Sequence, residues 1–389
     1  MPLRKVLSER EEELPRGELG KLLQVAVERK DVISFGPGEP DFPTPKHIIK
    51  AAQSALSKGF THYSPPAGRQ DLREEISKKL KRENKISVEP EEIIVTAGST
   101  EGILLSMLSV VDPGEFVLVP DPGFIAYIPV VEMLNGYPVS IPMYEKNGWQ
   151  FDPDDIKKLL TEPERTRAII LNTPANPTGV VYSKNILEEI ADIAVDNELL
   201  IVSDEAYEKF VYSGKHVSIA SLNGMKDYVL TLNTFSKTYG MAGFRLGYAA
   251  GPKKIIDAMK DLHIYSSICA PTPSQLAGLS ALRGPQNHVK KIISEYKKRR
   301  DLIVKRINEI SGLQCLSPQG SFYCFAKYDL KMSSTDLSET ILKKAKVAVI
   351  PGHDFGRYGE GYIRFSFATS TKNIENGMDR IEKFFNSLL

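Results

Sequence analysis

Short apolar runs alternate with amphipathic stretches through the middle of the chain. The apolar runs predict strands, and the amphipathic stretches between most of them predict helices. The predicted strands cover residues 93–96, 116–119, 168–171, 199–202, 228–232 and 246–250, and the predicted helices cover 101–111, 124–134, 153–160 and 184–197. Continuous apolar strands separated by helices are typical of a mostly parallel sheet that is buried on both faces. We therefore expect an α/β fold here.

The two ends of the chain have a different pattern. Residues 1–30 predict an arm and a helix with an apolar face from Leu19 to Val27, and helices near 47–58 and 70–85 follow. After residue 284 the pattern predicts three strands and three helices, at 285–310, 320–326, 333–344, 347–352, 361–367 and 372–388. Fewer strands with interleaved helices favour a smaller α+β domain. We expect an arm with part of the small domain over 1–45, a large domain over 46–285 and the rest of the small domain over 286–389.

Composition and charge narrow the function classes. The chain has 389 residues, of which 42% are hydrophobic and 25% charged, enough for one large or two unequal domains. A net charge of +1 without a basic or acidic block argues against nucleic acid and anionic membranes as partners. Three cysteines without a CxxC pair fit the reducing cytoplasm, and six histidines without an HxxxH pair argue against a metal enzyme. No signal peptide or 18-residue apolar run is present.

Candidate ligand-binding residues follow the predicted strands, at the edge where parallel α/β sheets bind ligands. Ser99 and Thr100 begin the helix after the first strand, which favours either an anion site or an ordinary helix cap. Phe124 follows the second strand and is either a core residue or a ring that stacks on an aromatic ligand. Asn176 lies in a rigid turn after the third strand, as an Asx-turn residue or as an amide donor.

A carboxylate and a phenol follow the fourth strand. Asp204 ends an apolar run, where a carboxylate is costly unless it is paired. Glu205 comes next and therefore points to the opposite face of the strand. Tyr207 places a phenol donor three residues after Asp204.

The stretch 231–247 carries an amine and a guanidinium. Lys237 lies beside the hydroxyls of Thr234 and Ser236, and Arg245 follows eight residues later. A single lysine in a loop is usually solvated, but a guanidinium fork with hydroxyls suits a phosphate.

Together these residues match the needs of pyridoxal 5′-phosphate (PLP). The cofactor needs a lysine for its aldehyde, an anion opposite its pyridinium nitrogen, donors at its phenolate oxygen and a site for its phosphate. Each residue alone is a weak signal, but their occurrence at successive strand ends indicates a PLP site.

The chain resembles the fold type I PLP enzymes, and within them the class I and II aminotransferases of the prokaryotic aspartate/aromatic subgroup. The resemblance runs from Ile33 to Arg364 and rests on Gly38-Glu-Pro-Asp-Phe, Tyr63 followed by Pro-Pro-Ala-Gly, Asn176-Pro-Thr-Gly, Asp204-Glu-x-Tyr207, Ser236-Lys237 with Arg245, and Arg364-x-Ser366. It implies a large PLP-binding domain with a mostly parallel seven-stranded sheet covered by helices, plus a smaller α+β domain.

The resemblance also implies roles for the residues that would hold the cofactor. The catalytic residues that it implies are Lys237, Asp204 and Tyr207, of which Lys237 holds PLP as a covalent aldimine and is the acid and base. Asp204 pairs with the pyridine nitrogen, while Tyr207 and Asn176 donate to the ring oxygen. Phe124 is the ring that stacks on the cofactor. The residues implied to hold the phosphate are Ser99, Thr100, Thr234, Ser236 and Arg245.

Three further residues are implied to serve the substrate and the neighbouring subunit. Arg364 clamps the substrate α-carboxylate in two parallel hydrogen bonds, whereas without the resemblance a surface ion pair would be its commoner role. The Gly38 backbone lines the substrate pocket, and Asn176 is implied to contact the substrate as well as the cofactor. Tyr63 reaches the phosphate of the neighbouring subunit, which implies a homodimer with active sites at the interface.

Departures from the subgroup concern the choice of amino donor. Aspartate-preferring members carry a lysine where Thr100 stands, and Arg16 is a candidate substitute for that lysine. Phe124 takes a place often held by Trp or Tyr. The donor is therefore left open among aromatic, aspartate and alanine-like amino acids.

The expected reaction is ping-pong amino transfer to a 2-oxo acid, with 2-oxoglutarate as the usual acceptor. A PLP-dependent C–S β-lyase is the alternative on the same scaffold. A PLP-binding regulatory module lacks support, because no helix-turn-helix extension precedes the domain. An NAD-dependent dehydrogenase lacks support, because no G-x-G-x-x-G follows a strand.

Overall fold

The structure is a computed structural model that describes residues 6–8, 11–12, 20 and 28–388. Arg16 and the helix expected from Leu19 to Val27 lie outside the described residues.

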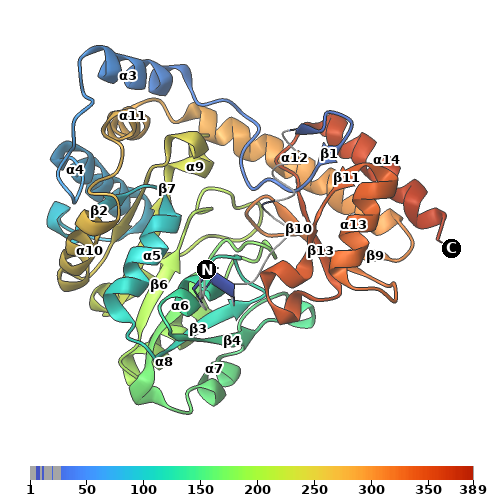
Figure 1. Cartoon of the computed structure of the whole chain (residues 1–389), viewed down its shortest axis with the longest axis horizontal. Coiled ribbons are helices and arrows are strands. Elements are labelled where there is room, and N and C mark those ends of the chain that lie inside the picture. Colours follow the sequence, from blue (N-terminus) through green and yellow to red (C-terminus); the bar gives the residue numbers. More distant parts are fainter. Residues whose placement is uncertain (1–5, 9–10, 13–19, 21–27, 389) are drawn as a thin grey trace, which may run out of the picture.

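A seven-stranded sheet forms the centre of the larger part of the molecule (Figure 1). Six strands are parallel to one another, and β8 runs antiparallel to both of its neighbours, which confirms the prediction of a mostly parallel sheet. In spatial order the strands are β2 (Ile93–Thr96), β8 (Gly247–Ala250), β7 (Val229–Thr234), β6 (Leu200–Asp204), β5 (Thr166–Asn172), β3 (Phe116–Asp121) and β4 (Tyr137–Pro142). The apolar pattern missed β4, because it is an edge strand that contains two prolines.

Helices cover both faces of this sheet. Val117 and Val119 of β3 pack on one face against α5 (Ser99–Val110), α6 (Tyr127–Met133) and α10 (Lys253–Ser266), whereas Leu118 packs on the other face against α8 (Lys184–Asp196). Further helices cover the β2–β8 end of the sheet or flank β4, namely α3 (Lys46–Ser57), α4 (Gln70–Lys79), α11 (Thr272–Arg283) and α7 (Pro153–Leu159). Both faces of the sheet are therefore buried. The polar residues that follow the strands lie at the carboxyl edge of the sheet, which the helices on the two faces do not cover.

A second, antiparallel sheet has its own apolar core (Figure 1). Its order is β12 (Ile350–Pro351), β13 (Tyr362–Ser366), β10 (Tyr323–Tyr328) and β9 (Leu313–Cys315), packed by α12 (Asn287–Glu309), α13 (Ser334–Ala345) and α14 (Thr371–Asn386). Beside it, β1 (Ile33–Ser34) pairs in parallel with β11 (Val347–Ala348), so the N-terminal segment lies with the C-terminal part of the chain. The domain boundaries at residues 45 and 285 stay a prediction.

Candidate active site

A cavity of about 90 Å³ lies at the carboxyl ends of β5, β6 and β7. It brings together the residues predicted for the cofactor, apart from Tyr63, and adds two that the sequence did not single out, Asn172 and Ala206. The predicted residues in its lining are Ser99, Thr100, Phe124, Asn176, Asp204, Tyr207, Thr234, Ser236, Lys237 and Arg245.

Lys237 lies in α9 (Phe235–Thr238), a single turn that follows β7 directly. Thr234 caps this turn by accepting a hydrogen bond from the Ser236 N–H at 3.1 Å, which fixes where the turn begins. The Lys237 Nζ donates to the carbonyl oxygen of Gly38. Burial lowers the pKa of the Lys237 amine to about 8, so a sizeable fraction of this amine is neutral near pH 7 to 8.

Asp204 ends β6 and is almost fully buried. Its Oδ2 accepts a hydrogen bond of 2.8 Å from the Tyr127 hydroxyl, and its Oδ1 accepts one of 3.1 Å from the Ala206 N–H. Burial raises the pKa of Asp204, and these two hydrogen bonds oppose the rise. Asp204 makes no ion pair within 4 Å in the part of the chain that the structure describes, so the site has room for a cation opposite this carboxylate.

The N-terminus of α5 and Arg245 form an anion cradle. Among the described residues no side chain caps α5, so its first N–H groups are available to a ligand. Arg245 adopts a left-handed conformation (φ 50°) and donates to the carbonyl oxygens of Ala242 and Ala97 at 3.0 and 3.3 Å. Gly98 precedes α5 with φ 88°, and a Cβ built on it would lie 2.5 Å from Arg245 Nη2. Only glycine therefore allows the guanidinium this close to the helix start.

A second cavity, of about 180 Å³, adjoins the first and shares Phe124, Asn176, Tyr207 and Lys237 with it. Its remaining lining residues come mainly from the smaller sheet and its neighbouring segments, and they are Gly38, Ile125, Tyr323, Ile350, Phe355 and Arg364. The prediction had placed Gly38 and Arg364 at a substrate pocket, and the structure brings both to this second cavity.

Arg364 is a buried cation held from several sides. Its Nη1 donates to Asn176 Oδ1 at 2.9 Å and its Nη2 to the Gly36 carbonyl, while Nε has no partner among the described atoms. Its Cζ lies 4.4 Å from the centre of the Tyr323 ring and 4.9 Å from that of Phe355. Burial lowers the pKa of Arg364 from its ordinary value, yet a guanidinium stays charged in proteins. The cavity thus contains a fixed positive charge.

Tyr63 does not join either cavity. Its side chain is 78% exposed, which leaves it free to contact another molecule. Its expected reach into a neighbouring subunit stays a prediction.

Sequence reasoning missed Tyr127 and Tyr323, which contact Asp204 and Arg364. Tyr127 is part of Phe124-Ile-Ala-Tyr, whose aromatic spacing of three places both rings on one side of a helix start, a signal that could have been used. Tyr323 carried no such signal, because its partners lie on elements distant in sequence.

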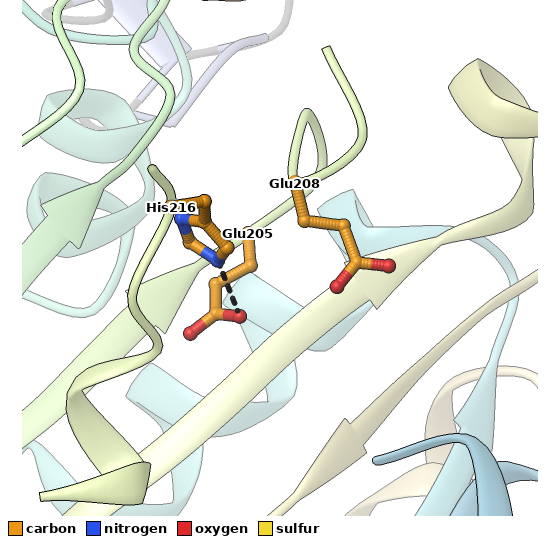
Figure 2. Close-up of side chains that lie close together, drawn as sticks. All are labelled: Glu205, Glu208 and His216. Atoms are coloured by element: carbon orange, nitrogen blue, oxygen red, sulfur yellow. Dashed lines mark hydrogen bonds and ion pairs between the residues drawn. The ribbon is translucent and has the colours of Figure 1, made fainter. Parts of the chain in front are cut away.

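Glu205 lies on the other side of β6 from Asp204, as predicted, and joins the cluster in Figure 2. Glu205, Glu208 and His216 bring their ligand atoms within 4.8 Å of one another, a spacing that could hold a metal. Donors already saturate Glu205, namely Asn84, Ser203, His216 and Ser218, and Lys79 and Asn84 both donate to Glu208. Although burial opposes it, Lys79 lowers the pKa of Glu208 to about 2. The cluster is therefore a buried ion network.

Comparisons with known proteins place the chain in a family. It matches the family described as aminotransferase class I and II over residues 30–381. It is 45% identical to an aspartate aminotransferase of Pyrococcus abyssi and 44% identical to aromatic-amino-acid aminotransferase 2 of Thermococcus litoralis, each over 97% of both chains. The crystal structure of an aromatic aminotransferase from Pyrococcus horikoshii superposes with a TM-score of 0.89 at 43% identity, over 95% of this chain and 99% of the other.

The fold and the site define a fold type I PLP enzyme, as predicted. The chain belongs to the class I and II aminotransferases, which use PLP bound through an imine to a lysine, and it is an aminotransferase. In the described part of the chain, every helix is too short or too polar to span a bilayer.

Proposed function

We propose that this aminotransferase takes amino groups from L-amino acids with aromatic or other apolar side chains and passes them to a 2-oxo acid such as 2-oxoglutarate. The observation that carries the proposal is the composition of the second cavity. Its side-chain space is bounded by apolar and aromatic groups, and its only cations among the described residues are Arg364 and Lys237. The apolar and aromatic residues are Phe124, Ile125, Tyr323, Ile350 and Phe355.

The first cavity suits PLP on three counts. Asp204 is a buried carboxylate that makes no ion pair within 4 Å among the described residues, although the charge of Lys237 acts on it from farther away, and this suits a pyridinium nitrogen. The uncapped start of α5 and Arg245 suit a phosphate. Lys237 supplies an amine with a lowered pKa, which suits an aldehyde. When bound, PLP supplies an electron sink for the bond that breaks at the substrate Cα.

The protein residues then hold the cofactor and the substrate in place. Phe124, Tyr207 and Asn176 line the same cavity, where Phe124 would offer a ring to the cofactor and Tyr207 and Asn176 would offer donors to its ring oxygen. Asn176 Oδ1 already accepts from Arg364, so its Nδ2 is the group left to donate. Arg364 binds the substrate α-carboxylate with its guanidinium, in place of part of its present contact with Asn176 and Gly36.

Lys237 moves the proton in this proposal. Lys237 would hold PLP through its amine, and after the substrate has displaced it the neutral Nζ would be the base that takes the proton from the substrate Cα and the acid that gives it back. A pKa near neutrality lets one group act as both base and acid. The carbonyl of Gly38 accepts from Nζ and keeps the amine over the site.

The acceptor raises a second requirement, because 2-oxoglutarate carries a distal carboxylate. Arg16 is our candidate for this carboxylate, although it lies outside the described residues. Aspartate as donor would need the same cation, so the two preferences should change together in an Arg16→Leu variant.

A donor panel tests the proposal. Purified protein with PLP is mixed with single amino acids, and the half-reaction is followed by cofactor absorbance. Phenylalanine and tyrosine should react with a kcat/KM at least about tenfold above that of aspartate, since pocket fit discriminates by about 10- to 200-fold. The opposite order overturns the donor assignment.

Lys237→Ala should lose turnover, and wild-type turnover in that variant would overturn the mechanism. Pyruvate and ammonia formed from cysteine conjugates without an added 2-oxo acid would instead support the β-lyase alternative.

We also propose that the chain works as a homodimer in the cytoplasm. The exposed Tyr63, which the family resemblance directs toward the phosphate of a neighbouring subunit, supports the dimer. The three free cysteines fit a reducing compartment. Sedimentation of the purified protein, with Tyr63→Phe assayed for PLP affinity, tests the shared site.

A further inference from the structure

Tyr323 touches both ends of the candidate site. Its hydroxyl oxygen lies 2.8 Å from that of Tyr207, and its ring centre lies 4.4 Å from Arg364 Cζ. It is 1% exposed, so packing fixes its position. A Cβ built on Gly38 would lie 2.3 Å from the Tyr323 hydroxyl, so the backbone that accepts from Lys237 passes over this side chain.

The direction of the bond between the two phenols follows from counting protons. A phenol has one proton to donate. If Tyr207 gives its proton to the ring oxygen of the cofactor, the Tyr207 oxygen can only accept in its bond with Tyr323. Tyr323 must then be the donor. Hydrogen bonds that follow one another in a chain with the same donor-to-acceptor direction polarise and strengthen one another.

The ring of Tyr323 acts on a different partner. Arg364 lies between the rings of Tyr323 and Phe355, at 4.4 and 4.9 Å. Its two terminal nitrogens have acceptors, but its Nε has none among the described atoms. The aromatic faces therefore limit how the guanidinium can turn, and a flat, fixed guanidinium binds a carboxylate in two parallel bonds.

We propose that Tyr323 is a positioning residue with two separable parts: its hydroxyl holds Tyr207 as a donor to the cofactor, and its ring holds Arg364 for the substrate carboxylate. The proposal rests on the roles of Tyr207 and Arg364 in the proposed function. It deepens that function by linking the cofactor end of the site to the substrate end through one side chain.

Variants of Tyr323 separate the two parts. Tyr323→Phe keeps the ring, and it should raise the pH midpoint of the absorbance change of bound PLP in the same direction as Tyr207→Phe. The expected size is about fivefold in proton affinity, because one neutral hydrogen bond contributes roughly 1 kcal/mol. The KM of every donor should stay within about twofold, since the ring remains over Arg364. Tyr323→Leu should raise the KM of all donors together by at least about tenfold.

The double variant decides whether the hydroxyl acts through Tyr207. In a Tyr207→Phe background, Tyr323→Phe should move the midpoint no further, because the acceptor oxygen is gone. Tyr328→Phe is the matched control: Tyr328 lies on the same strand, and its hydroxyl bonds Met332 and Glu360 away from the site. Tyr328→Phe should leave the midpoint unchanged.

Three outcomes overturn the inference. A midpoint that Tyr207→Phe moves and Tyr323→Phe does not move overturns the role of the hydroxyl while leaving the proposed function intact. An equal shift by Tyr323→Phe with and without Tyr207 overturns its action through Tyr207. A Tyr207→Phe variant with the wild-type midpoint overturns the proposed role of Tyr207 and the inference together.

Discussion

Tyr127 donates a hydrogen bond of 2.8 Å to Oδ2 of Asp204, and both side chains are buried. Tyr127 is the first residue of α6, the helix that follows β3, whereas Asp204 ends β6. In the sheet, β6 lies two places away from β3. The phenol thus holds the carboxylate that faces the cavity and favours its charged form.

We predict that Tyr127→Phe weakens PLP binding. Without the phenol, Asp204 loses one of its two hydrogen bonds and is less readily ionised. Hydrogen bonds to charged groups contribute about 1.5–3 kcal/mol, so the dissociation constant of PLP should rise by roughly 10- to 100-fold. Equilibrium titration followed by fluorescence measures it. The control is Tyr182→Phe, because Tyr182 is also fully buried but, among the described residues, the Met143 sulfur at 3.9 Å is the only hydrogen-bond partner of its hydroxyl. Unchanged affinity in Tyr127→Phe would contradict the role of this pair.

A glycine pair tests the phosphate cradle. Gly98→Ala should raise the dissociation constant of PLP by about tenfold or more, because the new Cβ would lie 2.5 Å from Arg245 Nη2 and push the guanidinium away. Binding of pyridoxal, which lacks the phosphate, should change little. Gly59→Ala carries a similar backbone strain, with φ 77° against 88°, but its Cβ meets nothing within 4 Å. Equal losses in both variants would mean that strain, and not the guanidinium, explains the effect.

The lowered pKa of Lys237 predicts a pH dependence for cofactor loading. Only a neutral amine attacks the PLP aldehyde, and the Lys237 amine becomes neutral as the pH rises through about 8. Stopped-flow rates of PLP incorporation into cofactor-free protein should therefore rise between about pH 6 and pH 8 and level off above that. A rate that continues to rise toward pH 10, as for an ordinary lysine, would contradict the effect of burial.

Arg364 should affect all substrates alike. Arg364→Leu should raise the KM of every amino donor by on the order of 100-fold, since the α-carboxylate is common to all of them. Arg364→Lys keeps the charge but loses the paired donors, so the KM of each donor should lie between those of the wild type and of Arg364→Leu. A steady-state comparison of phenylalanine, alanine and aspartate measures this, and an effect limited to aspartate would assign Arg364 to the side-chain carboxylate instead.

The buried ion network should contribute to stability. Lys79→Met removes the nearer of the two cations beside Glu208 and leaves only Lys209, at 3.8 Å, so it should lower the free energy of unfolding by up to about 3–5 kcal/mol. Lys78→Met is the control, because Lys78 pairs with Glu75 at an exposed position and should change stability by less than about 1 kcal/mol. The pKa of Glu208 is lowered, so its contribution is present above about pH 4.5 and is lost as the pH falls toward about 2. Urea unfolding between these pH values follows the loss.

The sequence predicted the strand-end residues well and the contacts between distant elements poorly. Asp204 and Lys237 were found because strand periodicity and chain order place them at one edge of a parallel sheet. Tyr323 was missed because tertiary packing alone brings it to Arg364, whereas Tyr127, which contacts Asp204, was missed although its spacing from Phe124 offered a signal. The strand β4 was missed because its prolines and half-buried edge position give a weak pattern. The catalytic and binding roles assigned to these residues stay predictions until the variants are measured.

β1 pairs in parallel with β11, which precedes β12 of the smaller sheet by one residue, and this pairing places Gly36 and Gly38 beside that sheet. Arg364 and Tyr323 are carried by β13 and β10 of that sheet, and Arg364 donates to Gly36. Lys237 and Asp204 are carried by the larger sheet. In the proposed function, the side of the site that carries Arg364 would bind the carboxylate of the amino acid, and the side that carries Lys237 and Asp204 would hold its amine at the cofactor. A ligand that has only a carboxylate or only an amine would contact one side of the site and leave the other side without a partner.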